Sequence, residues 1–341
     1  MERHSTSCHA SCFGIHVSRR RFLGGLAAGV AALTAPQTAN AGEVGGYPPP
    51  PPLGSPIEGA IDFHVHSAPD VFGRAITDIE VAQAAVAAKM RAIVLKNHVT
   101  MTADRAWLVS KAVPGLQVFG GVVLNRAVGG INPDAVEWTF RMEGRLGKTV
   151  WMPTFDADHH RKVRKLPGDG LQAAKNGTLL PETEAVLKVI ARENLVLHTG
   201  HLSPDEIMAL IKRGRELGVA NIVVTHAMAE APGLSIPQMQ EAARGGAYLE
   251  LIYLSALMGP QAHMAWMREA KGVSIRDMAE AVKAVGAQHY ILSTDLGQTG
   301  NPIHPDGYKL LVAGLKAEGI SQEQVELMMK RNPGTLLGLD T

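Results

Sequence analysis

Short apolar runs alternate with longer helical segments from Ala60 onward, and this alternation constrains the fold more than any other feature of the 341-residue chain. The runs are rich in β-branched residues and almost continuously apolar, which is typical of strands in a parallel sheet buried on both faces. They cover eight segments, namely 61–66, 92–98, 117–124, 149–155, 195–199, 221–226, 247–254 and 289–294. Eight strands separated by helices over about 280 residues predict a single α/β domain, a (β/α)₈ barrel of the TIM type.

The helical segments begin with recognisable capping patterns. Thr77 and Glu80 form a capping box before a helix predicted over 81–90. Ser203, Pro204 and Glu206 combine an N-cap, a first-turn proline and an N3 glutamate before a helix predicted over 207–217. Six further helices are predicted over 132–146, 182–193, 236–244, 275–285, 306–318 and 322–331.

An open, doubly wound sheet is the alternative architecture. That fold binds its ligand where the strand order reverses, and it usually carries a glycine-rich phosphate loop after a strand. No G-x-G-x-x-G or G-x-x-x-x-G-K-[ST] pattern follows any of the eight runs. The sequence therefore favours the barrel and argues against nucleotide binding.

The first 41 residues have the pattern of an export signal. A basic stretch at 18–21 precedes a Gly/Ala-rich apolar run over 23–33, and Ala39-Asn40-Ala41 provides a small-residue cleavage site. The run is about half the roughly 20 residues that a spanning helix needs, so we expect no stable membrane anchor. The order Ser-Arg-Arg-x-Phe-Leu resembles the twin-arginine signal, which implies a bacterial protein that engages the twin-arginine export machinery and is periplasmic or exported.

Cleavage after Ala41 changes the composition of the mature chain. Both cysteines lie before this point, and the 33 basic and 32 acidic residues fall by four and one, to 29 and 31. The resulting charge of −2 gives no electrostatic reason to expect a nucleic-acid partner. Residues 42–58, with five consecutive prolines from Pro48 to Pro52, are predicted to form a stiff linker before a barrel domain over 59–341.

Metal-capable side chains recur where the predicted strands end. His64 and His66 are two residues apart on the first strand and should project to the same side. The fifth, sixth and eighth strands end at His198, His226 and Asp295. Active sites of (β/α)₈ barrels lie at this end of the strands, and nitrogen and oxygen ligands suit a divalent ion such as zinc. The sequence therefore predicts a metal site at the carboxyl ends of the strands.

This arrangement resembles the amidohydrolase superfamily of metal-dependent barrels. The resemblance extends over Ala60–Leu339 and rests on His-Val-His in the first strand, the single histidines and aspartate above, and the ending Asn-Pro-Gly-Thr-Leu-Leu-Gly-Leu at 332–339. It implies that the four histidines and Asp295 bind metal. It also implies that Asp295 accepts a proton from the metal-bound water and returns it to the leaving group, in keeping with general acid–base chemistry at a bound cation.

One position departs from the superfamily pattern. Binuclear members usually carry a carboxylated lysine or a glutamate on the fourth strand, whereas this strand reads Val150-Trp151-Met152-Pro153-Thr154. The second strand instead offers Lys96 and His98, which share a face. Lys96, carboxylated, would then bridge two metal ions; in the alternative, one ion is bound and Lys96 or His98 contacts substrate.

Further residues near the strand ends are candidates for substrate binding. Arg74 follows the first strand and could hold an anionic group in a fork geometry. Asn125 follows the third strand, and His201 lies three residues after His198. The polar, basic stretch over 156–180 is expected to be a long loop after the fourth strand, as either a lid or a solvated insertion.

Together these features predict an exported metal-dependent hydrolase that attacks an amide, ester, lactone or phosphoester of a small molecule, with one or two divalent ions, zinc foremost. A decarboxylase or hydratase on the same barrel is one alternative. A periplasmic binding protein with a degenerate metal site is another. A homo-oligomer is compatible with the sequence.

Overall fold

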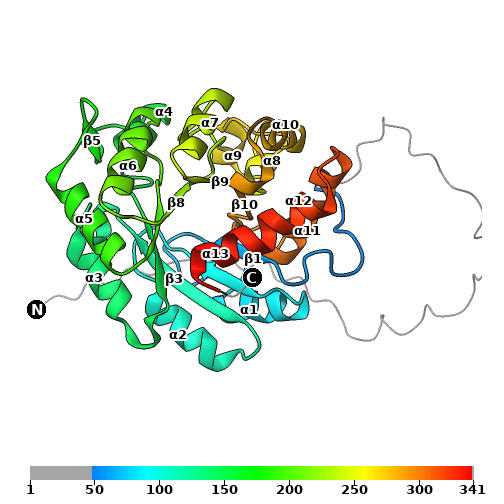
Figure 1. Cartoon of the computed structure of the whole chain (residues 1–341). Helices are drawn as coiled ribbons and strands as arrows, with labels where there is room; N and C mark the ends of the chain where they lie inside the picture. Colours follow the sequence, from blue (N-terminus) through cyan, green and yellow to red (C-terminus); the bar gives the residue numbers. More distant parts are fainter. Residues whose placement is uncertain (1–47, 340–341) are drawn as a thin grey trace, which may run out of the picture. The chain divides into compact units, whose positions relative to one another are not determined.

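Eight parallel strands form the centre of the protein in the computed structural model, which describes residues 48–339 (Figure 1). Each strand pairs with its neighbour in chain order, so the predicted barrel is confirmed. The strands are β1 (Ile61–Val65), β2 (Ala92–Leu95), β3 (Gln117–Val123), β4 (Gly147–Trp151), β7 (Val196–His198), β8 (Asn221–Val224), β9 (Tyr248–Ile252) and β10 (Tyr290–Ser293). The predicted export signal lies outside the described residues.

The last strand returns to the first and nearly closes the barrel. The backbone N–H of Asp295 donates to the carbonyl of His64 at 2.9 Å, and that of His66 donates to Leu296 at 3.0 Å. One step earlier the buried carboxyl group of Asp62 accepts from the backbone N–H of Thr294 at 3.0 Å and from its hydroxyl at 2.6 Å. These contacts bring the ends of β1 and β10 together.

Helices surround the strands. The principal ones are α1 (Asp78–Ala87), α2 (Ala103–Ala112), α3 (Pro133–Arg141), α5 (Pro181–Arg192), α6 (Pro204–Glu216), α7 (Ile236–Arg244), α10 (Ile275–Val285) and α11 (His304–Ala317). The capping boxes predicted for α1 and α6 are both present. The sequence did not predict α2, whose first-turn neighbour Thr102 makes no side-chain cap and instead donates its hydroxyl to the carbonyl of Leu95 at 2.7 Å.

The chain after the last strand closes the amino-terminal end of the barrel. It forms α12 (Gln322–Glu326), a π-helical turn over Leu327–Arg331 and α13 (Asn332–Leu337). The side chain of Asn332 donates to the carbonyls of Ala287 and Tyr290 at 3.1 and 2.7 Å. Leu336 and Leu337 then pack into the apolar interior of the barrel beside inward residues of the strands.

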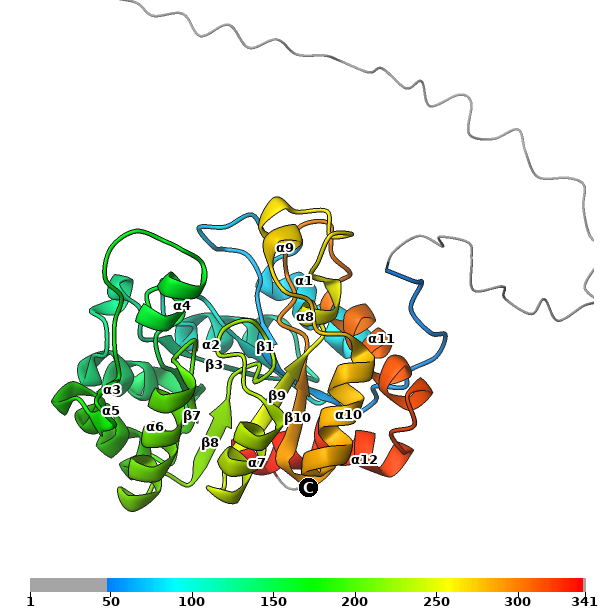
Figure 2. The ribbon, with the colours of Figure 1, turned by 90° about the horizontal axis from the view of Figure 1, so that it is seen from above.

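Two excursions leave the opposite end of the barrel. The segment over 156–180, expected to be a loop, contains α4 (Asp158–Val163) and a small hairpin, β5 (Ala174–Lys175) with β6 (Thr178–Leu179). The second excursion follows β9 and contains α8 (Leu254–Leu257) and α9 (Ala265–Glu269). Figure 2 shows α4, α8 and α9 on the side of the barrel opposite α12.

No helix within residues 48–339 is long and apolar enough to span a membrane.

Candidate functional site

A cavity of about 470 Å³ opens at the carboxyl ends of the strands. Polar side chains from the strand ends line its floor, namely His66, Lys96, His98, His226 and Asp295. Its walls include Phe72, Phe155, Met258, Met264 and Trp266, which lie on the connecting segments. The cavity therefore combines a polar floor with largely apolar walls.

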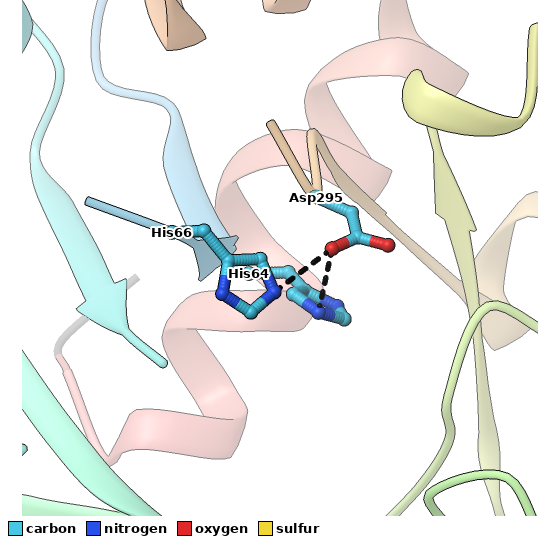
Figure 3. Close-up of side chains that lie close together, drawn as sticks. All are labelled: His64, His66 and Asp295. Carbon is cyan, nitrogen blue, oxygen red and sulfur yellow. Dashed lines mark ion pairs between the residues drawn. The ribbon is translucent and has the colours of Figure 1, made fainter. Parts of the chain in front are cut away.

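Three side chains on the floor form a group that can hold a metal ion. Oδ1 of Asp295 lies 3.0 Å from Nε2 of His64 and 3.1 Å from Nε2 of His66. The donor atoms lie within 4.8 Å of one another, and all three residues are buried (Figure 3). One nitrogen from each histidine and one carboxylate oxygen thus converge on a single point, as a zinc site requires.

A bulge in β1 directs His64 into this group. Asp62 pairs with Ile93 whereas Val65 pairs with Leu95, so β1 carries one more residue than β2 over this stretch. Phe63 packs inside the barrel, and the ring of the next residue, His64, also faces the interior, 6.3 Å from the ring of Trp151. Strict alternation would send neighbouring side chains to opposite faces. The bulge places both inside, which is a common use of bulges beside functional sites.

The electrostatics of the group favour a charged carboxylate. Burial alone would raise the pKa of Asp295, but the charge and hydrogen bond of His64, together with those of His66, hold that pKa well below its ordinary value. Burial lowers the pKa of His66 well below 6.5. A carboxylate and, at His66, a neutral imidazole are protonation states that ligate cations. At His64 burial acts in the same direction, but the charges of Asp295 and Glu250 outweigh it and raise the pKa.

Glu250, on β9, holds His64 from behind, a role that the sequence pattern does not predict. Its carboxylate oxygens lie 3.2 and 3.3 Å from Nδ1 of His64, and it also accepts the backbone N–H of His226 at 3.0 Å. Burial would raise the pKa of Glu250, yet the facing histidines lower it to about 2. An acid in an otherwise apolar strand was the available signal, but the pattern did not show which face it occupied.

Lys96, at the end of β2, is buried beside the same group. Its Nζ lies 2.9 Å from Nε2 of His64 and 5.5 Å from the ring centroid of Trp151. Burial lowers the pKa of Lys96 to about 8. Trp151 is the last residue of the fourth barrel strand, so the side chain that reaches the metal-capable group is Lys96, which follows the second strand.

The histidines of the fifth and sixth barrel strands are not members of the three-residue group, although the ring of His226 stacks on that of His64 with centroids 5.9 Å apart. His198 packs against the rings of Trp151 and Phe63 at 5.0 and 5.5 Å, and neither ring nitrogen has a partner within residues 48–339. Nε2 of His226 lies 3.1 Å from Nε2 of His201. Of the predicted ligands, the structure thus brings His64, His66 and Asp295 into one cluster.

His201 connects His226 to the first excursion. Nδ1 of His201 lies 2.9 Å from Nδ1 of His160, which belongs to α4 and lines the cavity. Burial lowers the pKa of His160 to about 4. The sequence predicted a long loop around His160, as a lid or a solvated insertion, because nothing in its local pattern shows that α4 folds back over the strand ends.

Arg164 joins the two excursions and the connection after β8 beside the cavity. Arg164, directly after α4, pairs with Glu230 at 2.8 Å and donates to the carbonyl of Trp266 at 3.2 Å. Both Arg164 and Glu230 line the cavity. The wall is therefore a joined structure built from three separate connections.

His98 lines the cavity, whereas Asn125 does not. Nδ1 of His98 lies 2.9 Å from the hydroxyl of Thr154, and its ring stacks on Phe155 with centroids 4.0 Å apart at the cavity. The side chain of Asn125 donates to the carbonyl of His98 at 3.0 Å and accepts from the backbone N–H of Thr154 at 2.8 Å. Asn125 is not among the described residues that line the cavity, so it ties two strand ends together instead of facing it.

Arg74 lies on the loop after β1, close to the metal-capable group. Its guanidinium pairs with Asp70 at 2.7 Å, and Nη2 lies 3.2 Å from Nδ1 of His66. The loop is fixed to the segment after the last strand by an antiparallel bridge between Arg74 and Gln298. Arg74 therefore faces both the cavity and a candidate ligand.

Comparison with known proteins gives one family and one fold. A model described as a family of unknown function, DUF6282, matches residues 59–250. No curated protein matches the chain.

Among solved structures, the chain is similar to an organophosphorus hydrolase from Deinococcus radiodurans, with 16% identity, a TM-score of 0.54 and coverage of 82% of this chain and 92% of that one. A second structure concerns organophosphate hydrolysis engineered from a weak, promiscuous lactonase template, with 16% identity, a TM-score of 0.54 and coverage of 84% and 98%. At such identities the likeness shows the fold.

Proposed function

We propose that this chain, which belongs to the family of unknown function DUF6282, is a metal-dependent hydrolase. The observation that carries the proposal is the convergence of His64, His66 and Asp295 in a buried group, where the two Nε2 atoms lie 3.0 and 3.1 Å from Oδ1 of Asp295. The group lies at the end of the barrel where active sites of this fold are found.

The donor set fits a divalent cation, and we favour zinc. Two imidazole nitrogens and one carboxylate oxygen form the three-ligand set of a catalytic zinc site that leaves a further position for water. The hydrogen bond between His64 and Glu250 supports this, since metal-binding histidines commonly donate their second ring nitrogen to a carboxylate.

The residues of the chain divide the work of hydrolysis. When bound, a cation of this kind lowers the pKa of water toward about 7 and polarises the bond under attack. Asp295, whose second oxygen points away from His64 and His66 in Figure 3, is placed to take a proton from water and pass it to the leaving group. Arg74 and His98, which line the cavity beside the same group, would orient the substrate.

We propose one ion in the three-residue group. A second ion would need Lys96 as a carboxylated bridge, with His226 and either His198 or His201 on its far side. Nζ of Lys96 lies 2.9 Å from Nε2 of His64, within reach of the group, and we favour a direct role for it at the first ion or at the substrate. Metal analysis that gives two ions per chain, falling to one in Lys96→Ala, would establish the bridge instead.

The substrate that we propose is a small molecule with an apolar group beside a hydrolysable amide, ester, lactone or phosphoester. Phe72, Phe155 and Trp266 offer aromatic surface in the wall of the cavity. The names of the similar structures, an organophosphorus hydrolase and a lactonase template, give two bond types with which to begin.

We further propose that the chain is exported through the twin-arginine machinery and acts in the periplasm or outside the cell. The support is the basic, apolar and small-residue order of residues 18–41. Replacement of Arg19 and Arg20 by lysine should retain the protein in the cytoplasm on cell fractionation. Unchanged export would contradict this proposal.

The activity is tested by turnover of a panel of lactones, aryl esters and phosphotriesters with zinc-loaded and chelated protein. Hydrolysis that depends on zinc and is lost in Asp295→Asn supports the proposal. Product analysis separates hydrolysis from decarboxylation or hydration. Retained ligand binding with no turnover in any form of the protein would show a binding protein.

A further inference from the structure

Part of the cavity wall is a cluster of aromatic rings centred on Phe155. The ring of Phe155 stacks on His98 with centroids 4.0 Å apart, and it meets Phe72 edge to face at 5.8 Å. The rings of His160 and His201 lie 5.4 and 5.9 Å from it. These five residues all line the cavity and belong to the segments that follow four different strands. The cluster is therefore assembled by the fold and not by one local motif.

The backbone on both sides of Phe155 is held in place. One side-chain oxygen of Asn125 accepts the backbone N–H of Thr154 at 2.8 Å and that of Asp156 at 3.4 Å. The hydroxyl of Thr154 lies 2.9 Å from Nδ1 of His98, whose ring covers one face of Phe155. Phe155 nevertheless remains 37% exposed. An aromatic side chain that is already fixed loses little conformational freedom when a ligand covers it.

The second excursion supplies further apolar side chains. Met258, Met264 and Trp266 line the cavity and belong to the segment between β9 and α10. Methionine adapts to irregular shapes, and its sulfur makes favourable contacts with aromatic rings. A flat ring that enters the cavity can therefore contact both aromatic rings and thioethers.

A charged donor lies beside the aromatic cluster. The guanidinium carbon of Arg74 is 5.7 Å from the ring centroid of Phe72, and its side chain is only 5% exposed. Nε and Nη2 of Arg74 both lie 2.7 Å from Oδ2 of Asp70, and Nη2 also lies 3.2 Å from Nδ1 of His66. The third nitrogen, Nη1, has no hydrogen-bond partner within residues 48–339. Because Arg74 lines the cavity, Nη1 is available to an anionic group such as a carboxylate.

We propose that the cavity binds compounds in which an aromatic ring carries a carboxylate on a short side chain. The ring lies against Phe155, and the carboxylate accepts from Nη1 of Arg74. The inference rests on the proposed function for the reaction that follows, because it names the substrate class of the same site. Arg74 contacts His66, so the bond that is hydrolysed is one close to the carboxylate.

An aliphatic ligand is the alternative occupant of these apolar walls. A cavity that recognises apolar area alone binds a cyclohexyl group at least as tightly as a phenyl group, because the cyclohexyl group offers more apolar surface. A cavity built from rings instead favours phenyl by about two- to tenfold, since aromatic pairs gain free energy beyond that of the buried area. Matched phenyl and cyclohexyl ligands therefore separate the two occupants.

The test uses three ligands and the purified protein after removal of metal, so that no cation binds the carboxylate. The ligands are 3-phenylpropionate, 3-cyclohexylpropionate and 3-phenylpropionamide, and isothermal titration calorimetry measures their affinities. We expect the phenyl acid to bind most tightly and the cyclohexyl acid about two- to tenfold more weakly. The amide should bind about ten- to hundredfold more weakly, because it loses a charge-assisted hydrogen bond. Failure of the phenyl acid to bind, or binding of either other ligand with equal affinity, would overturn the proposal.

Substitutions at two positions separate the ring from the charge. Phe155→Leu should abolish the preference for phenyl over cyclohexyl and keep the preference for the acid over the amide, whereas Arg74→Gln should do the reverse. Phe155→Tyr retains the ring and should retain both preferences. Phe72→Leu, at a half-exposed position of the same cluster, provides a second loss of ring contact should Phe155→Leu fail to fold. Trp138→Leu, remote from the cavity, is the control that should change neither preference.

Zinc binding and hydrolysis are measured separately on the same preparations. A folded Phe155→Leu or Phe72→Leu protein with an unchanged phenyl preference would overturn the inference. Zinc-dependent hydrolysis by a protein that shows no phenyl preference would defeat the inference and leave the proposed function intact. Both preferences in a protein that binds no zinc would defeat the proposed function and leave the ligand class intact.

Discussion

The floor and the mouth of the cavity are built on different principles. At the floor and just behind it, His64 and Asp295 lie at or just beyond strand ends and Glu250 lies within β9; all three are buried, and each has hydrogen-bonding partners on another strand. At the mouth, Phe72 and Trp266 come from connecting segments and are 46% and 39% exposed. The floor is fixed by mutual contacts, whereas the mouth presents apolar surface to whatever enters.

This difference separates chemistry from recognition. A buried group with several partners cannot be replaced without leaving another group unpaired, which costs free energy. A half-exposed aromatic side chain loses only its own contacts. We therefore expect large effects on rate and metal binding from the floor and modest effects on substrate affinity from the mouth.

The largest expected effect comes from Asp295→Asn. Loss of the group that moves the proton should lower kcat by about 10²–10⁴-fold. Steady-state kinetics on the best substrate of the panel measures this, with Asp306→Asn on α11 as a control that should leave kcat unchanged. A variant at position 295 with more than a third of wild-type kcat would show that the floor does not carry the chemistry.

The next largest expected effect is a loss of folding stability in acid, caused by the buried His304. His304 donates from Nε2 to the carbonyls of His66 and Leu296 at 2.9 and 2.8 Å, and burial lowers its pKa from 6.5 to about 4. Between these values the unfolded chain takes up a proton that the folded chain does not, so stability falls as pH falls from 6.5 to 4. The shift corresponds to about 3 kcal/mol.

Urea unfolding at pH 7 and pH 4.5 tests this contribution. His304→Gln, which retains a donor for the two carbonyls, should lose less stability between the two pH values than the wild type does. An identical loss in both proteins would show that His304 is not responsible for any of it.

A smaller effect is expected from Glu250→Gln. The amide still reaches Nδ1 of His64, but it no longer supplies a full negative charge that fixes the ring. Zinc affinity should fall roughly ten- to hundredfold. Glu241→Gln, at an exposed position on α7, is the matched control. An unchanged zinc affinity in Glu250→Gln would show that Glu250 does not support the metal site.

The smallest effect belongs to the mouth. Trp266→Ala should raise KM about three- to tenfold with little change in kcat, since an apolar contact made equally in ground and transition states affects binding alone. Trp138→Ala on α3, also exposed but remote from the lining of the cavity, should change neither constant. A fall in kcat in Trp266→Ala would show that the mouth also contributes to the chemical step, and would contradict the division between floor and mouth.

The sequence predicted the regular parts of the molecule well because strand and helix periodicity are local. The eight strands and the placement of His64, His66 and Asp295 at their ends follow from that periodicity and from one general rule about barrels. The register of β1 does not, because a bulge depends on pairing with β2, which is distant in the chain.

Residues that act through tertiary contacts were missed or misplaced for the same reason. Glu250 shows its role only when β9 stands beside His64. His160 reaches His201 because α4 turns back over the strand ends. The side-chain amide of Asn125 is hydrogen-bonded to backbone groups of other strand ends. None of these contacts leaves a periodic trace in the sequence.

The central claim is that one cation in the group of His64, His66 and Asp295 makes this chain a hydrolase. Its most direct test is a titration of fully chelated mature protein with zinc, with hydrolytic rate and bound metal measured in the same samples. We expect a rate near zero without metal that rises in proportion to bound zinc and reaches a plateau at one ion per chain. Full activity of the chelated protein, or zinc bound at one equivalent with no hydrolysis of any substrate of the panel, would contradict it.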